Sequence, residues 1–172
     1  MNKVINLVEI QETQKKFLKF LEDKTDMTYT KNNFEVTKQQ ALCMLSELYE
    51  LENETKCHKW WDKQEIKRNK VLKELADLLS HIANTANQLD VQLILEDYLV
   101  GKKHLEGQIL SLTRHMYELS YLKNTFYTRQ KIRTIFKEYI ELLYSLGFTI
   151  EQLESEYYNE LDYNYKKFRR EI

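Results

Sequence analysis

Apolar residues recur at intervals of three and four positions along most of the chain, as they do on one face of an amphipathic helix. In the first such segment, Ile10, Phe17 and Leu21 share a face. The polar stretch 24–35 that follows predicts a loop. We predict helices over residues 6–23, from residue 37 onward, and over 67–89, 91–100, 105–122, 128–146 and 150–170.

Helix-capping signals mark several ends of these segments. Thr37 with Gln40 has the spacing of a capping box, and Thr149 with Gln152 has the same spacing. Gly147 is typical of the residue that follows the last turn of a helix. These signals therefore predict helix starts near residues 37 and 149 and a helix end before residue 147.

The composition favours an all-α fold. The 172 residues include no proline and three glycines, and 31% of them are charged, which suits long surface helices and disfavours turn-rich β architecture. Gly101 and Gly107 predict a loop between two helices. The length is sufficient for one well-cored domain, so we expect residues 1–172 to form a single all-α helical bundle.

Charge and hydropathy exclude several functional classes. The net charge of −1 gives no reason to expect direct binding to nucleic acid or to a membrane surface. No apolar run approaches the roughly 20 residues that cross a bilayer, and the N-terminus shows no targeting signal, so we expect a cytoplasmic protein. Cys43 and Cys57 have neither metal-ligand spacing nor a disulfide framework, and we predict that both are reduced thiols.

Two pairs of acidic residues have the same spacing. Glu47 and Glu50 form the first pair, and Glu74 and Asp77 form the second. Residues three apart share a helix face, so a turn between two helices could bring the four carboxylates together. Their mutual repulsion would be relieved by a bound cation, and oxygen ligands indicate Mg²⁺, with Mn²⁺ as the alternative. A single E-x-x-E is usually only a solvated face, but the matched second pair favours a metal site.

Polar residues within the helical segments could border a ligand pocket. Gln14 interrupts an apolar stripe, where its amide could pair with a nucleobase edge. Alternatively, Gln14 is a boundary residue half in solvent. His81, Asn84 and Asn87 follow one another at about one helical turn and form a second polar stripe. His81 alone could equally be a structural residue.

The segment between the acidic pairs combines cationic and aromatic groups. His58, Lys59, Trp60 and Trp61 are consecutive. A lysine near a carboxylate-bound metal suits the phosphates of a metal-nucleotide complex, and a tryptophan can stack on a base. Alternatively, the two tryptophans plug a hydrophobic hinge. The basic run 166–170 could likewise reach phosphates or remain solvated.

These motifs resemble the dimeric dUTPases of the all-α nucleoside triphosphate pyrophosphatase superfamily, which includes MazG-like proteins. The family pattern E-x-x-E followed by E-x-x-D is similar to Glu47, Glu50, Glu74 and Asp77. The family's Q-x-x-L, N-E, F-K-Y/F-W and closing L-G-F-T elements resemble residues 14–17, 53–54, 58–61 and 146–168. The resemblance covers most of the chain and is least constrained in its middle segment, residues 90–125.

The resemblance implies hydrolysis of dUTP to dUMP and pyrophosphate by a Mg²⁺-dependent homodimer. The four acids would bind the metal, and Glu47 or Glu50 would activate the water that attacks the α-phosphate. Gln14, Trp61 and Asn87 would face uracil, while basic residues would hold the triphosphate. The substrate-binding residues implied are Gln14, Asn53, Glu54, Lys56, Lys59, Trp61, His81, Asn87, Asn164 and Lys167.

The chain departs from the family pattern at a few positions. Glu160 and Leu161 replace the lysine and asparagine of the closing motif, and Lys167 replaces an arginine, whereas Asn164 matches. Ser80 occupies the place where the family often has histidine, three residues after the metal-binding aspartate. The closing motif of this chain is therefore divergent.

Two classes of function remain open. The first is a nucleotide pyrophosphatase that acts on dUTP or on another deoxynucleotide. The second is an interaction protein on the same helical scaffold, which binds a protein regulator through the middle segment with weak or no catalysis. Segments 105–122 and 139–146 are apolar enough to form a subunit interface as well as a core, which favours association of subunits, and the resemblance implies a homodimer.

Overall fold

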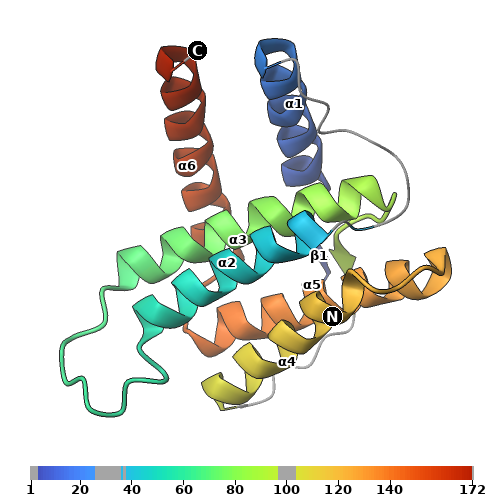
Figure 1. Cartoon of the computed structure of the whole chain (residues 1–172). Coiled ribbons are helices and arrows are strands. Elements are labelled where there is room, and N and C mark those ends of the chain that lie inside the picture. The colour runs from blue at the N-terminus through green and yellow to red at the C-terminus, as the bar shows by residue number, and fades with distance from the viewer. Residues whose placement is uncertain (1–3, 26–35, 37, 97–103, 172) are drawn as a thin grey trace.

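The computed structural model describes residues 4–25, 36, 38–96 and 104–171 and shows an all-α helical bundle, as predicted (Figure 1). No helix in the described part of the chain is both long enough and apolar enough to cross a membrane. The elements in chain order are β1 (Ile5–Asn6), α1 (Val8–Thr25), α2 (Lys38–Thr55), α3 (Arg68–Gln88), β2 (Ile94–Leu95), α4 (Leu105–Leu119), α5 (Thr125–Ser145) and α6 (Ile150–Glu171).

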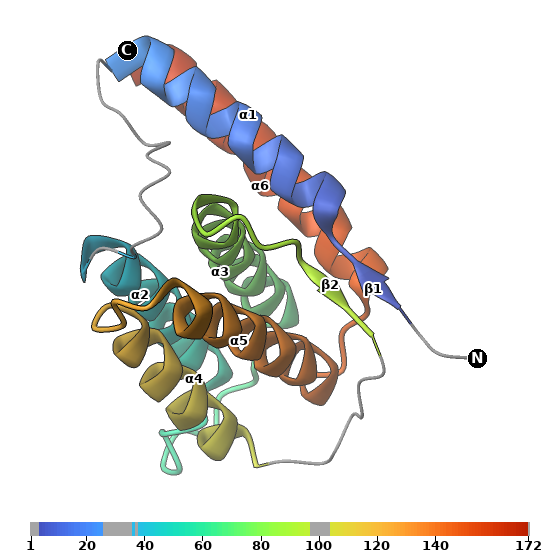
Figure 2. The same ribbon diagram turned by 90° about the vertical axis from the view of Figure 1, so that its right-hand side faces the viewer.

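Helix α3 is the central element of the fold. It packs against α1, α2, α5 and α6, and Leu75, Leu79 and Ile82 on it are fully buried. The helices α2, α4 and α5 lie on one side of α3, whereas α1 and α6 form a pair of long helices on the other side (Figures 1 and 2). Side chains of α3 therefore face two different groups of helices.

The two short strands correct part of the sequence-based prediction. Residues 94–95 form β2 and pair antiparallel with β1, in the register Ile5↔Leu95 and Asn6↔Ile94. The helix predicted over 91–100 is therefore wrong for 91–96, and 97–100 lie outside the described residues. Val91 and Leu93 are buried while Gln92 between them is exposed, and this alternation is typical of extended backbone rather than of a helix.

Most predicted helix ends lie within a few residues of the observed ones. The capping box at Thr149 is confirmed, because Gln152 N donates to Thr149 Oγ1 and Thr149 N donates to Gln152 Oε1. Gly147 has φ +76, the left-handed conformation expected after the last turn of a helix. The prediction that Gly107 borders a loop is wrong, because Gly107 lies inside α4.

Two further predictions at helix ends have mixed outcomes. The loop predicted over 24–35 begins slightly late, since α1 continues to Thr25, and 26–35 lie outside the described residues. Thr37, the predicted start of the other capping box, also lies outside the described residues. Cys43 and Cys57 are both free thiols, as predicted.

Arg68 joins the first turn of α3 to the turn between α5 and α6. Its guanidinium donates to the carbonyls of Leu146 and Gly147 at 3.3 and 3.1 Å, and it lies over the Phe148 ring at 4.3 Å from the centroid. These contacts satisfy carbonyls at the end of α5. The start of α6 is thereby held beside the start of α3.

Candidate metal and nucleotide site

Helices α2 and α3 bring three of the four predicted acids together. Glu47 and Glu50 come from α2, and Glu74 comes from α3. One carboxylate oxygen from each lies within 4.8 Å of the others. The i, i+3 spacing places Glu47 and Glu50 on one face of α2, and the packing of α2 on α3 places that face opposite Glu74.

The fourth acid, Asp77, is not part of this group of three and forms an ion pair with Lys73. Lys73 Nζ lies 2.6 Å from Asp77 Oδ2, 3.8 Å from Glu74 Oε1 and 4.0 Å from Glu160 Oε2. Burial alone would lower the pKa of Lys73, but the hydrogen bond and charge of Asp77, with the two glutamates, raise it above its ordinary value. Lys73 therefore remains charged and offsets part of the negative charge of the acids.

The environment of Glu74 disfavours its ionised form. Burial is the main cause that raises the pKa of Glu74 to about 7; Lys73 opposes this increase, whereas Asp77, Glu50 and Glu47 add to it. Among the described residues, no group donates a hydrogen bond to the buried Glu74 Oε2. A cation at this place would provide the missing partner, and an all-oxygen donor set suits Mg²⁺ or Mn²⁺.

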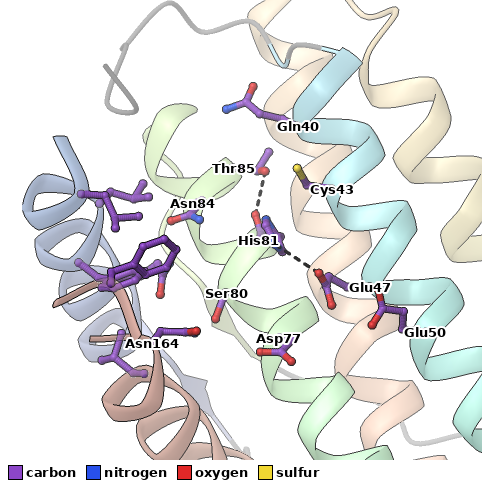
Figure 3. A pocket seen from close by; sticks show the side chains of 16 residues that line it. Gln40, Cys43, Glu47, Glu50, Asp77, Ser80, His81, Asn84, Thr85 and Asn164 are labelled. Atoms are coloured by element: carbon purple, nitrogen blue, oxygen red, sulfur yellow. Dashed lines mark hydrogen bonds and ion pairs between the residues drawn. The ribbon is translucent and has the colours of Figure 1, made fainter. Parts of the chain in front are cut away.

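A pocket of about 500 Å³ adjoins these acids. It lies between α2 and α3 on one side and α1 and α6 on the other (Figure 3). Its polar wall includes Glu47, Glu50 and Asp77, while Phe17 and Phe168 belong to its apolar wall. Such a combination of an apolar surface and a few polar groups is typical of a small-molecule site.

Gln14 lies in the apolar wall of this pocket and is only 4% exposed, so it is not the half-solvated boundary residue of the alternative interpretation. Tyr157 Oη donates to Gln14 Oε1 at 2.9 Å. Burial raises the pKa of Tyr157 well above its ordinary value, so the phenol stays a donor at neutral pH. The Gln14 carbonyl therefore accepts from Tyr157, while no described residue accepts from its NH₂ group, which can donate to a ligand.

Four more polar residues of α3 and one of α6 line the pocket: Ser80, His81, Asn84, Thr85 and Asn164. His81 Nε2 lies 3.7 Å from Glu47 Oε1, and Ser80 is next to it. Asn84 points from α3 into the pocket (Figure 3), and its buried Oδ1 has no hydrogen-bond partner among the described residues. Asn164 faces these residues from α6.

Several predicted substrate-binding residues lie beside the acids rather than in the pocket. Asn53 and Glu54 border a smaller hollow that Glu50 and Glu74 also line. Lys59 donates to Asn53 Oδ1 at 2.6 Å. In the same turn, the Lys56 ammonium lies 3.1 Å from a carboxylate oxygen of Asp62. Both lysines therefore pair with residues of their own segment in this structure.

The tryptophans and two further predicted residues are more remote from the pocket. Trp60 and Trp61 are 89% and 62% exposed and pack edge to face with each other, so they do not plug a hinge. Asn87 does not line the pocket, because it donates to Gln11 O and accepts from Gln11 Nε2. Lys167 is exposed and lies near Phe168.

The sequence interpretation missed Lys73 and Tyr157. Lys73 precedes Asp77 by four residues, which is the spacing of a helical ion pair and could have identified it. Tyr157 occupies an apolar position of α6, and no local signal distinguishes it from a core aromatic residue.

Comparison with known families agrees with the geometry of the site. A family model described as dUTPase matches residues 6–171. Comparison with curated proteins gave no match. The family match extends from β1 to the last turn of α6 and includes every element that contributes to the acids and the pocket. It supports a role in dUTP hydrolysis and confirms the resemblance seen in the sequence: the chain belongs to the dUTPase family.

Proposed function

We propose that this protein hydrolyses dUTP to dUMP and pyrophosphate with the help of Mg²⁺, which Mn²⁺ could replace. The observation that supports this most directly is the meeting of Glu47, Glu50 and Glu74 beside a pocket whose opposite wall contains Gln14. The acids suit a cation and its phosphate ligand, and the pocket is large enough for a nucleoside.

The residues of the two acidic pairs would hold the metal and the attacking water. Glu47, Glu50, Glu74 and Asp77 are the proposed ligands, and Asp77 would exchange part of its contact with Lys73 for the cation. A bound divalent cation supplies charge neutralisation and a more acidic water. Glu47 or Glu50 would accept the proton of that water as it attacks the α-phosphorus. The bond from this phosphorus to the bridging oxygen then breaks, and pyrophosphate leaves.

The base would be selected by the amides of the pocket. The NH₂ group of Gln14 can donate to the carbonyl at C4 of uracil. The unpartnered Oδ1 of Asn84 can accept from the ring N–H next to that carbonyl. Cytosine has an amino group and a bare ring nitrogen at these positions, so the two amides would disfavour it.

The other residues near the acids and the pocket would also contact the substrate or its cation. His81 and Asn164 line the pocket and would contact the nucleoside. Asn53 and Glu54 would complete the surroundings of the cation from the smaller hollow. Four others would reach the substrate only if their segments closed over it: Lys56, Lys59, Trp61 and Lys167. Asn87, on the packed helix α3, would have to exchange its hydrogen bonds with Gln11.

We also propose that the protein is a homodimer. Leu110 and Tyr117 of α4, with Tyr121 in the turn just after its end, form the α4 stripe and are 69%, 57% and 54% exposed. Lys38 of α2 lies over the Tyr121 ring, and Leu42, one turn further along α2, is 63% exposed. An apolar surface of this kind is more often an interface than a free surface. A protein regulator that binds the same stripe is the second candidate.

Replacement of one acid of α2 should nearly abolish turnover. We expect Glu50→Gln to lower the rate of pyrophosphate release from dUTP by about 100-fold or more, because the amide can neither accept the water proton nor bind the cation as strongly. Glu65→Gln, in the exposed turn, should behave like the parent. Absence of pyrophosphate from dUTP, dCTP, dTTP and UTP would favour the interaction protein.

Magnesium should stabilise the folded protein through Glu74. At a concentration about 100 times its dissociation constant, Mg²⁺ should raise the melting temperature of the parent by roughly 5–10 °C. Glu74→Gln should remove this shift and leave the metal-free melting temperature equal or higher, since a neutral amide relieves the repulsion from Glu47 and Glu50. An undiminished Mg²⁺ shift in Glu74→Gln, measured beside the Glu65→Gln control, would contradict the proposed ligand set.

The Tyr157 hydroxyl should affect base selection more than turnover. In Tyr157→Phe the Gln14 amide loses the donor that orients it, so KM for dUTP should rise by about fivefold to tenfold. The preference for dUTP over dCTP should shrink, while kcat changes little. Tyr158→Phe, at the next and more exposed position, should change neither. Equal losses of kcat in both variants would point to a general effect on α6 instead.

The α4 stripe should determine the oligomeric state. Light scattering of the parent after size exclusion should give twice the 20.9 kDa mass of one chain. We expect Leu110→Glu to shift the protein towards the monomer, because it places a charge in the apolar stripe. Lys137→Glu, on an exposed face of α5, is the control for the charge. A monomeric parent would rule out the dimer.

A further inference from the structure

A lysine continues the line of pocket residues along α3. Asp77, Ser80 and Asn84 line the pocket beside the acids (Figure 3), and their spacing of three and four positions places them on one face of the helix. Lys73 precedes Asp77 by four residues. It therefore lies on the same face, one turn nearer the start of α3.

Lys73 also adjoins the proposed metal ligands directly. Among the described lysines and arginines, it alone forms ion pairs with any of these ligands, namely Asp77 and Glu74. Lys56 and Lys59 pair with residues of their own turn instead. Lys73 is therefore the described lysine that is already in place beside a metal-bound phosphate.

The Lys73 ammonium is accessible and retains donor capacity. Its one hydrogen bond to a described residue, of 2.6 Å, is to Asp77 Oδ2. Glu74 Oε1 and Glu160 Oε2 lie 3.8 and 4.0 Å away, too far for hydrogen bonds. An ammonium group has three N–H donors, and the side chain is 42% exposed. Lys73 can therefore donate to a ligand while it keeps its contact with Asp77.

The order of groups along α3 determines which part of the substrate lies near Lys73. In the proposed reaction, Asn84 contacts the base, and the acids hold the cation beside the α-phosphate. A helix rises by 1.5 Å per residue, so Asp77 lies about 10 Å along α3 from Asn84, and Lys73 lies about 16 Å from it. A nucleotide that extends along α3 from Asn84 passes Asp77 first. Its β- and γ-phosphates then lie at Lys73.

Glu160 of α6 makes a cation necessary at this place. Its carboxylate oxygen lies 4.0 Å from Lys73 Nζ, on the side of α3 that faces α6. A phosphate that approaches Lys73 also approaches this carboxylate, and the two negative charges repel each other. Lys73 offsets this repulsion, and neutralisation of Glu160 should strengthen phosphate binding.

We propose that Lys73 is a substrate-binding residue that donates to the β- and γ-phosphates of the nucleotide, the part that leaves as pyrophosphate. This role rests on the proposed hydrolysis of dUTP and names the side chain that holds the leaving group. Without substrate, the same ammonium group is a counter-ion for Asp77 and Glu74.

Calorimetric titration of the full chain with α,β-imido-dUTP at saturating Mg²⁺ tests the proposal. In this analogue an N–H group replaces the bridging oxygen of the bond that breaks, so the analogue binds without turnover. Lys73→Met should weaken binding of the analogue at least tenfold, because a charge-assisted hydrogen bond is lost. Binding of dUMP, which lacks the β- and γ-phosphates, should change by less than about twofold.

Three further variants separate charge, position and folding. Lys67→Met is the matched control, because it makes the same substitution at an exposed lysine just before α3, and it should change neither affinity. Lys73→Arg keeps the charge and should retain most of the affinity for the analogue. Glu160→Gln leaves Lys73 intact and should tighten binding of the analogue about threefold, with a smaller effect on dUMP. Melting curves verify that each variant is folded.

The outcomes distinguish this role from the reaction on which it rests. A parent protein that does not bind the analogue, or binds it equally well without Mg²⁺, would contradict the proposed function and the role of Lys73 with it. If the parent binds as expected, undiminished affinity in folded Lys73→Met would overturn the role of Lys73 alone. Equal losses for the analogue and dUMP would show that Lys73 supports the metal site as a whole instead. Unchanged analogue affinity in Glu160→Gln would likewise place the phosphates away from Lys73.

Discussion

The approach of Glu74 to the acids of α2 is the interaction on which the rest of the site depends. Carboxylate oxygens within 4.8 Å of one another repel, so another force must hold them there. Core packing supplies it: Leu75 and Leu78, next to these acids on α3, are fully buried, and each such side chain stabilises the fold by about 1.5–3 kcal/mol. Tyr139, from α5, also donates to the Leu75 carbonyl at 2.7 Å. The buried leucines and this hydrogen bond therefore hold α3 close to α2 despite the repulsion between their carboxylates.

Lys73 explains how the metal-free protein tolerates this arrangement. It contacts Asp77, Glu74 and Glu160, the last of which belongs to α6. The glutamate at position 160 stands where the family's closing motif has a lysine. A basic residue there would face Lys73, whereas Glu160 gives Lys73 a third acidic neighbour.

The sequence predicted the features that depend on local periodicity. Helical spacing of apolar residues identified the helices, and the equal spacing of the two acidic pairs identified the face of α2 and α3 that carries the carboxylates. Prediction was wrong over 91–96, where a few apolar residues fit a helix or a strand equally well and pairing with β1 decides between them. The capping box at Thr149 is predicted correctly because both of its partners lie within one turn.

The hydrogen bonds between side chains of distant segments cannot be predicted in the same way. Asn87 has the spacing of a pocket residue, but Gln11 is the partner that occupies its amide. Gln14 stands out in the sequence because it interrupts an apolar stripe. The Tyr157 phenol that donates to it belongs to α6 and has no such local signal. The position of a polar residue in a helix defines the face on which it lies, and the tertiary contacts of that face determine what it binds.

The Tyr157 to Gln14 hydrogen bond also has a consequence for the order of folding. It joins residues 143 positions apart, whereas α2 and α3 are consecutive helices joined by residues 56–67. Contacts between distant segments cost more loop-closure entropy and form later than local ones. The carboxylates of α2 and α3 can therefore meet early, and the pocket wall that contains Gln14 is completed only when α1 and α6 dock.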